Sequence, residues 1–183
     1  MSAAALPNPG TAAVAIAADG IAKPPRRAVR AAYASALAAT AGFVPLHAVW
    51  ALGIPLWVDQ GKFREWYAAG GGPYLWVLNG LATLAGVLAL SLVRPWGLVV
   101  PRWVPLLAGR KVPARALAFT GFTVSALLLL YTGWAALLTV AQWNDDGIFS
   151  RWIVCYGIPQ FLVWGIGLLM AALSYRARTS AAR

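Results

Sequence analysis

Residues 116–141 read ALAFTGFTVSALLLLYTGWAALLTVA and contain no charged side chain. A helix needs about 20 consecutive apolar residues to cross the hydrocarbon core of a bilayer, and this stretch is long enough. Three further stretches have the same character, at about 31–58, 74–93 and 152–175. The sequence therefore predicts an all-α transmembrane protein with four spans. Because short connections favour antiparallel neighbours, we expect a four-helix antiparallel membrane bundle.

The composition agrees with a membrane protein. The chain is 61% hydrophobic and only 11% charged, whereas soluble domains carry about 25% charged residues. The formal net charge is +10, but the cations lie in the tail, the loops and the C-terminus, between the apolar runs. No basic helix or mixed aromatic and basic surface is present, so a nucleic-acid partner is not expected. The lipid bilayer is the partner that this composition indicates.

The distribution of Lys and Arg predicts the orientation. Twelve of them lie in the N-terminal flank, in the second loop and at the C-terminus, and three lie in the first and third loops. Loops rich in Lys and Arg stay in the cytoplasm. We therefore expect a multi-pass protein of the plasma membrane with both termini in the cytoplasm (N-in/C-in).

The chain divides into a tail and one membrane domain. Residues 1–30 are rich in Ala, Gly and Pro and lack a sustained apolar period, which predicts a disordered cytoplasmic tail. A signal peptide is the competing interpretation, but the apolar stretch from 31 to 58 is long enough to span the bilayer. The membrane domain is expected over 31–178, followed by a cytoplasmic end at 179–183.

The second loop, residues 94–115, is too rich in proline for a helix. We expect it to be an ordered segment along the inner interface, with Trp96 and Trp103 at headgroup depth and its arginines near phosphates. This segment is also the surface on which a homo-oligomer or a membrane partner is expected to dock.

Several kinds of chemistry are excluded by residue counts and by missing motifs. Cys155 is the only cysteine and His47 the only histidine, so an intrachain disulfide and a multi-His metal centre are excluded. The sequence has no GxSxG, P-loop, GxGxxG or HExxH motif. No cofactor and no metal are predicted.

Polar and aromatic residues inside the spans are candidates for a substrate-binding cavity, because polar groups in hydrocarbon are costly unless they are paired or functional. Helical spacing places His47, Trp50, Ile54 and Trp57 on one face of the first span. The full candidate set is His47, Trp50, Asn79, Tyr131, Trp134, Tyr156, Gln160 and Trp164. The alternative is that these side chains form hydrogen bonds between helices or fill space. We also expect Gly42, Gly80, Gly86, Gly121, Gly133 and Gly165 to permit close helix approach.

Two resemblances add to this interpretation. The runs Arg94-Pro95-Trp96-Gly97, 101–105 (PRWVP) and 109–113 (GRKVP), with 47–53 (HAVWALG) in the first span, resemble a group of small actinobacterial four-span membrane proteins. More loosely, the size, the ten tryptophans and the acids in the outer loops look like small bacterial integral-membrane terpene cyclases.

The second resemblance implies protonation-initiated cyclisation of a prenylated substrate. A carboxylic acid would protonate an alkene or epoxide, and aromatic faces would stabilise the cation. Asp59 or Glu65 would be the acid and Asp145 or Asp146 the second carboxylate, with Trp50, Tyr131, Trp134 and Trp164 as lining. The sequence departs from soluble cyclases because it lacks a DxDD motif. The alternative is a non-catalytic membrane subunit or a protein that binds a lipid or another hydrophobic ligand.

A general acid near neutral pH requires a desolvated carboxyl. If the first loop folds over the mouth of the bundle, we expect Glu65 to be partly buried and Asp59 to remain charged. The competing arrangement pairs these carboxylates with Lys62 and Arg64 as ordinary loop salt bridges.

Overall fold

The computed structural model describes residues 21–143 and 147–181. This part of the chain is helical and contains no strand, only two isolated β-bridges. Four helical segments are long and apolar enough to cross a membrane: Arg26–Ala51, Gln60–Ser91, Ala114–Ala141 and Arg151–Ala181. The prediction of an all-helical chain is confirmed for the described residues, and their four long apolar helices are consistent with an integral membrane protein.

The first span differs from its predicted boundaries at both ends. It consists of α2 (Arg26–Leu37), a π-helical segment η1 (Ala38–Phe43) and α3 (Val44–Ala51). Helix α2 begins at Arg26 because Pro25 is the extended residue before it, and arginine is a good helix former. Residues 26–30 therefore do not belong to a disordered tail, whereas residues 1–20 of that predicted tail lie outside the described part.

The helix ends at Ala51, seven residues before the predicted end at 58. Gly53 adopts a positive φ of 79°, which a right-handed helix cannot accommodate. Pro55 then follows, and it lacks the amide hydrogen that a helix needs. The prediction that Ile54 and Trp57 continue the face of His47 and Trp50 is therefore wrong, because both lie in the loop.

A short helix precedes the second span where a loop was expected. Helix α4 (Gln60–Trp66) leads through η2 (Tyr67–Gly71) into α5 (Gly72–Ser91). Asp59 is the N-cap of α4, and its carboxylate accepts a hydrogen bond from the backbone N–H of Lys62 at 2.9 Å. Such a cap stabilises a helix start by about 1 kcal/mol. Gly70 has a φ of 105° and marks the kink between α4 and α5.

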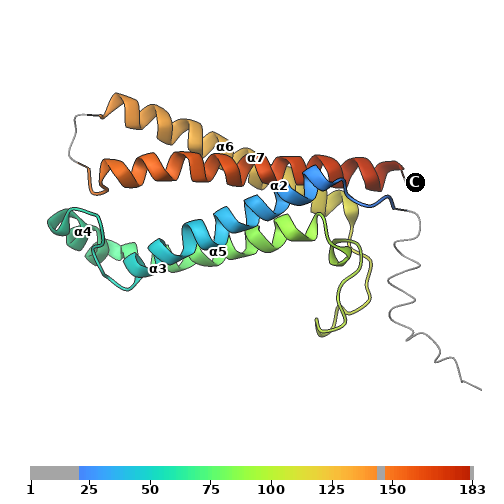
Figure 1. The fold of residues 1–183 in the computed structure, drawn as a ribbon. Coiled ribbons are helices and arrows are strands. Elements are labelled where there is room, and N and C mark those ends of the chain that lie inside the picture. The colour runs from blue at the N-terminus through green and yellow to red at the C-terminus, as the bar shows by residue number, and fades with distance from the viewer. Residues whose placement is uncertain (1–20, 144–146, 182–183) are drawn as a thin grey trace, which may run out of the picture.

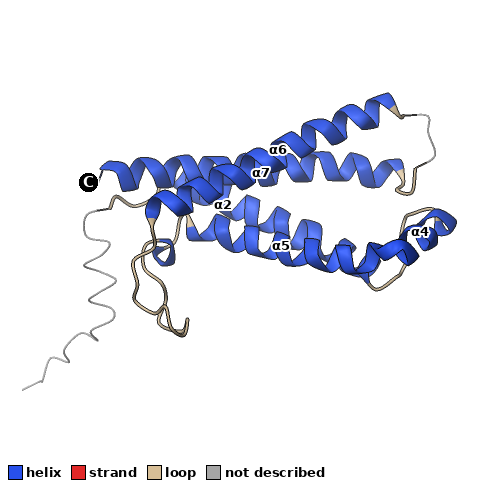
Figure 2. Cartoon of the chain, turned by 180° about the vertical axis from the view of Figure 1, so that it is seen from behind, coloured by secondary structure: helices blue, strands red, loops and turns tan. Residues whose placement is uncertain are grey.

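Helices α6 (Ala114–Ala141) and α7 (Arg151–Ala181) pack along one another, and α2 packs along both α7 and α5. Figure 1 shows that α6 and α7 diverge from α3 and α5 toward the end that carries α4. Figure 2 shows the same divergence from behind. The start of α2, the end of α7 and the loop before α6 lie together at the opposite end, which we call the basic end.

Helix α7 extends six residues beyond its predicted end at 175. No glycine or proline follows Tyr175 to interrupt it. The Thr179 hydroxyl donates to the Tyr175 carbonyl at 2.9 Å. The hydroxyl is thus satisfied by the helix's own backbone. Residues 179–181 are therefore helical, and their place in the predicted cytoplasmic end stays a prediction.

Small residues bring the helices close together near the basic end. A Cβ on Gly167 would lie 2.5 Å from the Ala31 carbonyl oxygen, and one on Gly165 would lie 2.8 Å from the Leu129 side chain. Of the predicted close-contact glycines, Gly42, Gly86, Gly121 and Gly165 do face a neighbouring helix, whereas Gly80 and Gly133 have nothing within 4 Å.

Two fully buried serines join the helices in the same region. Ser35 donates to the Trp164 carbonyl and Ser125 to the Gly165 carbonyl, both at 2.9 Å. The bonds attach α2 and α6 to consecutive residues of α7 and hold these three helices together.

The second loop is ordered, as predicted. Val100 donates to the Arg110 carbonyl and Val112 to the Leu98 carbonyl, both at 2.9 Å. The loop is attached to α7 because the buried Tyr175 hydroxyl donates to the Gly97 carbonyl at 2.7 Å. Its place at the membrane interface stays a prediction.

Candidate functional site

The divergence of the helices leaves two cavities in the half of the bundle that carries α4. The larger, of about 820 Å³, lies between α3 and α7, and we call it the lateral crevice. The smaller, of about 370 Å³, lies between α5 and α6 and is bounded by α3 and α7; we call it the aromatic pocket. Neither cavity has a charged side chain in its described wall.

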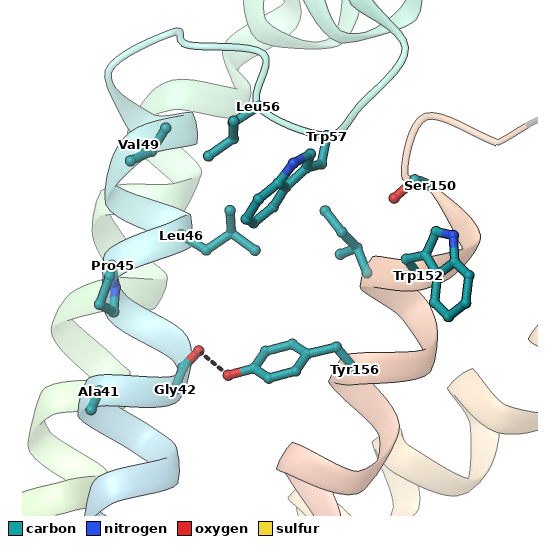
Figure 3. A pocket seen from close by; sticks show the side chains of 11 residues that line it. Ala41, Gly42, Pro45, Leu46, Val49, Leu56, Trp57, Ser150, Trp152 and Tyr156 are labelled. Carbon is teal, nitrogen blue, oxygen red and sulfur yellow. Dashed lines mark hydrogen bonds between the residues drawn. The ribbon is translucent and has the colours of Figure 1, made fainter.

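The lateral crevice has a helical wall on each side and a loop above it. Figure 3 shows Pro45 and Leu46 of α3 on one side, Trp152 and Tyr156 of α7 on the other, and Trp57 between them. Its lining residues are Ala41, Gly42, Pro45, Leu46, Val49, Leu56, Trp57, Ser150, Trp152, Ile153 and Tyr156. The wall is almost wholly apolar.

Trp57 is held over this crevice in an unusual backbone conformation. Its φ is 57°, which costs a non-glycine residue about 1–2 kcal/mol. The antiparallel bridge between Val58 and Phe149 and the 2.9 Å hydrogen bond from Asp59 N–H to the Ile148 carbonyl fix this loop against the last loop. Backbone strain of this kind concentrates at ligand-binding sites.

The wall of the crevice includes two residues of the π-helical segment η1, Ala41 and Gly42. Pro45 has no amide hydrogen to donate to the carbonyl four residues earlier, which disturbs the regular helical pattern there. Tyr156 donates to the Gly42 carbonyl at 3.0 Å (Figure 3), and Gln160 donates to the Ala38 carbonyl at 2.9 Å. Both donors of α7 thus satisfy carbonyls of η1 and join the two walls.

Aromatic rings surround the second cavity. The Phe43 and His47 rings stack with their centroids 3.5 Å apart, and the Phe161 and Trp164 rings stack at 5.6 Å. Tyr131 meets the edge of Phe161 at 5.1 Å. These five residues all lie in the wall of the aromatic pocket.

Two polar side chains of this pocket differ in whether they have a hydrogen-bond partner. His47 Nδ1 lies 2.8 Å from the Phe43 carbonyl oxygen, so this nitrogen carries a proton and donates to that carbonyl. Trp164 is 4% exposed, and its indole N–H has no hydrogen-bond partner in the described structure. A buried donor without a partner costs about 1–3 kcal/mol, so this N–H lowers the stability of the packing around the pocket.

The eight predicted binding residues do not form one cavity. His47, Tyr131 and Trp164 line the aromatic pocket, Tyr156 lines the crevice, and Gln160 bridges α7 and η1. Trp50, Asn79 and Trp134 line neither cavity.

These last three residues have different surroundings. Trp50 is buried and donates to the Leu56 carbonyl at 2.9 Å, which holds the loop after α3. Asn79 is 6% exposed, and both of its side-chain polar atoms lack a partner in the described structure. Trp134 is exposed on the surface of α6.

The two predicted acids that the structure describes, Asp59 and Glu65, line neither cavity. Asp59 is exposed and caps α4. Glu65 is also exposed, so the prediction that it is partly buried is wrong. Phe63 occupies the buried face of α4, and two residues further along a helix the side chain points to the opposite side. Asp145 and Asp146 lie outside the described residues.

Sequence reasoning missed several lining residues, among them Phe43, Phe161 and Trp152. The spacing of Phe43 and His47, four residues apart, was an available signal for a shared helix face. In an apolar span, however, a phenylalanine that lines a cavity has the same sequence pattern as one that faces lipid.

In the described ranges, no three His, Cys, Asp or Glu side chains come together as metal ligands would. Comparison with known proteins found no matching protein family, no matching curated protein and no matching solved structure.

Proposed function

We propose that this multi-pass membrane protein binds an apolar small molecule in the lateral crevice and the adjoining aromatic pocket. The observation that carries the proposal is the lateral crevice itself, about 820 Å³ between α3 and α7. Ligand sites typically measure about 300–1,000 Å³ and have mostly apolar and aromatic walls with few polar groups. Both cavities have walls of this kind.

The position of the crevice favours a ligand that enters from the bilayer. Tyr156 lies five residues after the start of α7, which corresponds to a depth of about 8 Å along the helix. The crevice thus lies beside the apolar part of two candidate spans. A prenyl chain or a similar lipid-soluble molecule has the required solubility.

We further propose that the spans are antiparallel and that both termini are cytoplasmic. The support is the distribution of Lys and Arg, which lie mostly at the start of α2, in the second loop and at the end of α7. In this orientation, the crevice and α4 lie in the outer half of the membrane.

Cyclisation of a prenylated substrate is a second candidate function. The aromatic pocket favours it, because the faces of Phe161, Trp164 and Tyr131 would stabilise a carbocation. The described walls supply no carboxyl group. The acid in this reaction would therefore be Asp145 or Asp146.

Photocrosslinking tests the binding proposal. The purified protein in nanodiscs is incubated with a prenyl chain that carries a diazirine, irradiated and mapped by mass spectrometry. We expect labels on residues of the crevice, such as Leu46 and Ile153, and competition by the unmodified prenyl chain. Uniform labelling of the lipid-facing surface, without competition, would contradict the proposal.

The same preparation tests cyclisation. It is incubated with prenylated substrates, and the products are analysed by mass spectrometry. Loss of a cyclised product in Asp145→Asn or Asp146→Asn, with prenyl-chain binding retained, would support the second candidate. Absence of any cyclised product from the unaltered protein would contradict it.

A further inference from the structure

Three arginine-lined cavities lie at the basic end, away from the two apolar ones. We infer that the cavity between the start of α6 and the end of α7 binds the phosphate of an anionic phospholipid. It measures about 480 Å³, and its lining includes Arg115, Phe119 and Phe122 of α6 and Arg176, Thr179 and Ser180 of α7.

The two arginines converge on this cavity from different helices. Both are exposed, and the Arg176 guanidinium lies over the Phe122 ring at 6.0 Å. The two carboxylates that the structure describes, Asp59 and Glu65, are at the opposite end of the bundle. The described part of the chain therefore supplies no carboxylate for this pair, and a bound anion would offset their mutual repulsion.

The start of α6 adds suitable donors. Pro113 precedes the helix and provides no side-chain cap, so the first backbone N–H groups of α6 lack a helical partner. Phosphate binds readily at such a helix start, where the helix dipole is positive. The Thr179 hydroxyl already donates to the Tyr175 carbonyl, which leaves Ser180 as the hydroxyl donor on this side.

A lipid fits this site better than free phosphate because the cavity continues into an apolar wall. Phe119 is 71% exposed and lies one turn further along α6 than Arg115. An acyl chain attached to the bound phosphate would run along this surface. With 28 residues, α6 is about 42 Å long, longer than the hydrocarbon core of about 30 Å. Its end therefore reaches the depth of lipid headgroups.

Lipid retention tests the inference. The protein is purified in mild detergent, exchanged into phosphatidylglycerol or phosphatidylcholine mixtures, and examined by native mass spectrometry. We expect preferential retention of phosphatidylglycerol, reduced about fivefold in Arg115→Gln and in Arg176→Gln, since one arginine near an anionic headgroup contributes about 1 kcal/mol. Arg110→Gln is the matched control, because it removes the same charge from the neighbouring loop but not from the cavity wall, and it should retain the lipid.

Three results would overturn the inference. Equal retention of both lipids, or equal loss in Arg110→Gln, would show that the cavity is not a specific site. Complete displacement of phosphatidylglycerol by millimolar inorganic phosphate would show that free phosphate is the ligand and that the apolar wall contributes nothing. None of these results bears on the apolar crevice and its proposed ligand.

Discussion

Substituting Gly167 by alanine should separate α2 from α7, because the added Cβ would lie 2.5 Å from the Ala31 carbonyl oxygen. Ordinary carbon–oxygen contacts are about 3.3 Å or longer, so the helices must move apart by about 0.8 Å. The hydrogen bond from Ser35 to the Trp164 carbonyl is 2.9 Å long. If this displacement lengthens it by the same amount, the distance exceeds the hydrogen-bonding range and the bond is lost. We expect a measurable loss of stability.

The size of the loss follows from three contributions. Overpacking costs about 1–3 kcal/mol, and the lost interhelical hydrogen bond costs about 0.6 kcal/mol. Alanine regains about 1 kcal/mol of helix propensity relative to glycine. The net destabilisation should therefore be about 0.6–2.6 kcal/mol.

Gly133→Ala is the matched control, since Gly133 lies within α6 and has nothing within 4 Å of an added Cβ. It should stabilise the protein by up to about 1 kcal/mol. Both variants are measured by denaturant unfolding in micelles, followed by tryptophan fluorescence. If Gly167→Ala is as stable as Gly133→Ala, the close packing of α2 on α7 is wrong.

Three further predictions concern the cap of α4, a hydrogen bond between helices and the topology of the chain. Asp59→Ala removes the cap of α4 and should speed hydrogen exchange of the first α4 amides about fivefold, equivalent to about 1 kcal/mol. The control Gln60→Ala should change these exchange rates little. Equal exchange rates in the two variants would refute the cap. Tyr156→Phe removes the hydrogen bond to η1 and should lower stability by about 0.6 kcal/mol; an unchanged unfolding midpoint would contradict that bond. Single cysteines at Glu65 and Arg110, in a Cys155→Ser background, should react with impermeant reagents from opposite sides of the membrane; labelling from one side would refute the proposed topology.

Much of the helical content could be predicted because apolar length alone identifies a span. Residues 116–141 differ from the observed α6 by two residues at the start. The boundaries failed where local backbone chemistry decides them. Gly53 ends the first span early through its positive φ, and Asp59 starts a helix where a loop was expected.

The candidate site was predictable only in part. Hydrophobic periodicity does not say which face of an apolar span points inward, so Trp134 was assigned to a cavity although it lies on the surface. Gln160 and Tyr156 donate to the Ala38 and Gly42 carbonyls, whereas Pro45 removes the helical donor for the Ala41 carbonyl. The sequence therefore gives no signal for these two bonds. The exposure of Glu65 follows from the orientation of α4, which tertiary contacts of Phe63 determine.

If the lateral crevice holds an apolar ligand, a side chain that fills the crevice should prevent binding. Val49 lines the crevice, whereas Val77 is 60% exposed on α5 and lines neither cavity. Equilibrium binding of a radiolabelled prenyl chain is measured in nanodiscs for Val49→Trp, Val77→Trp and the unaltered protein. We expect an affinity weaker by about tenfold or more for Val49→Trp, equivalent to about 1.4 kcal/mol, and an unchanged affinity for Val77→Trp. Equal affinities in all three proteins, or no saturable binding in any, would contradict the proposal.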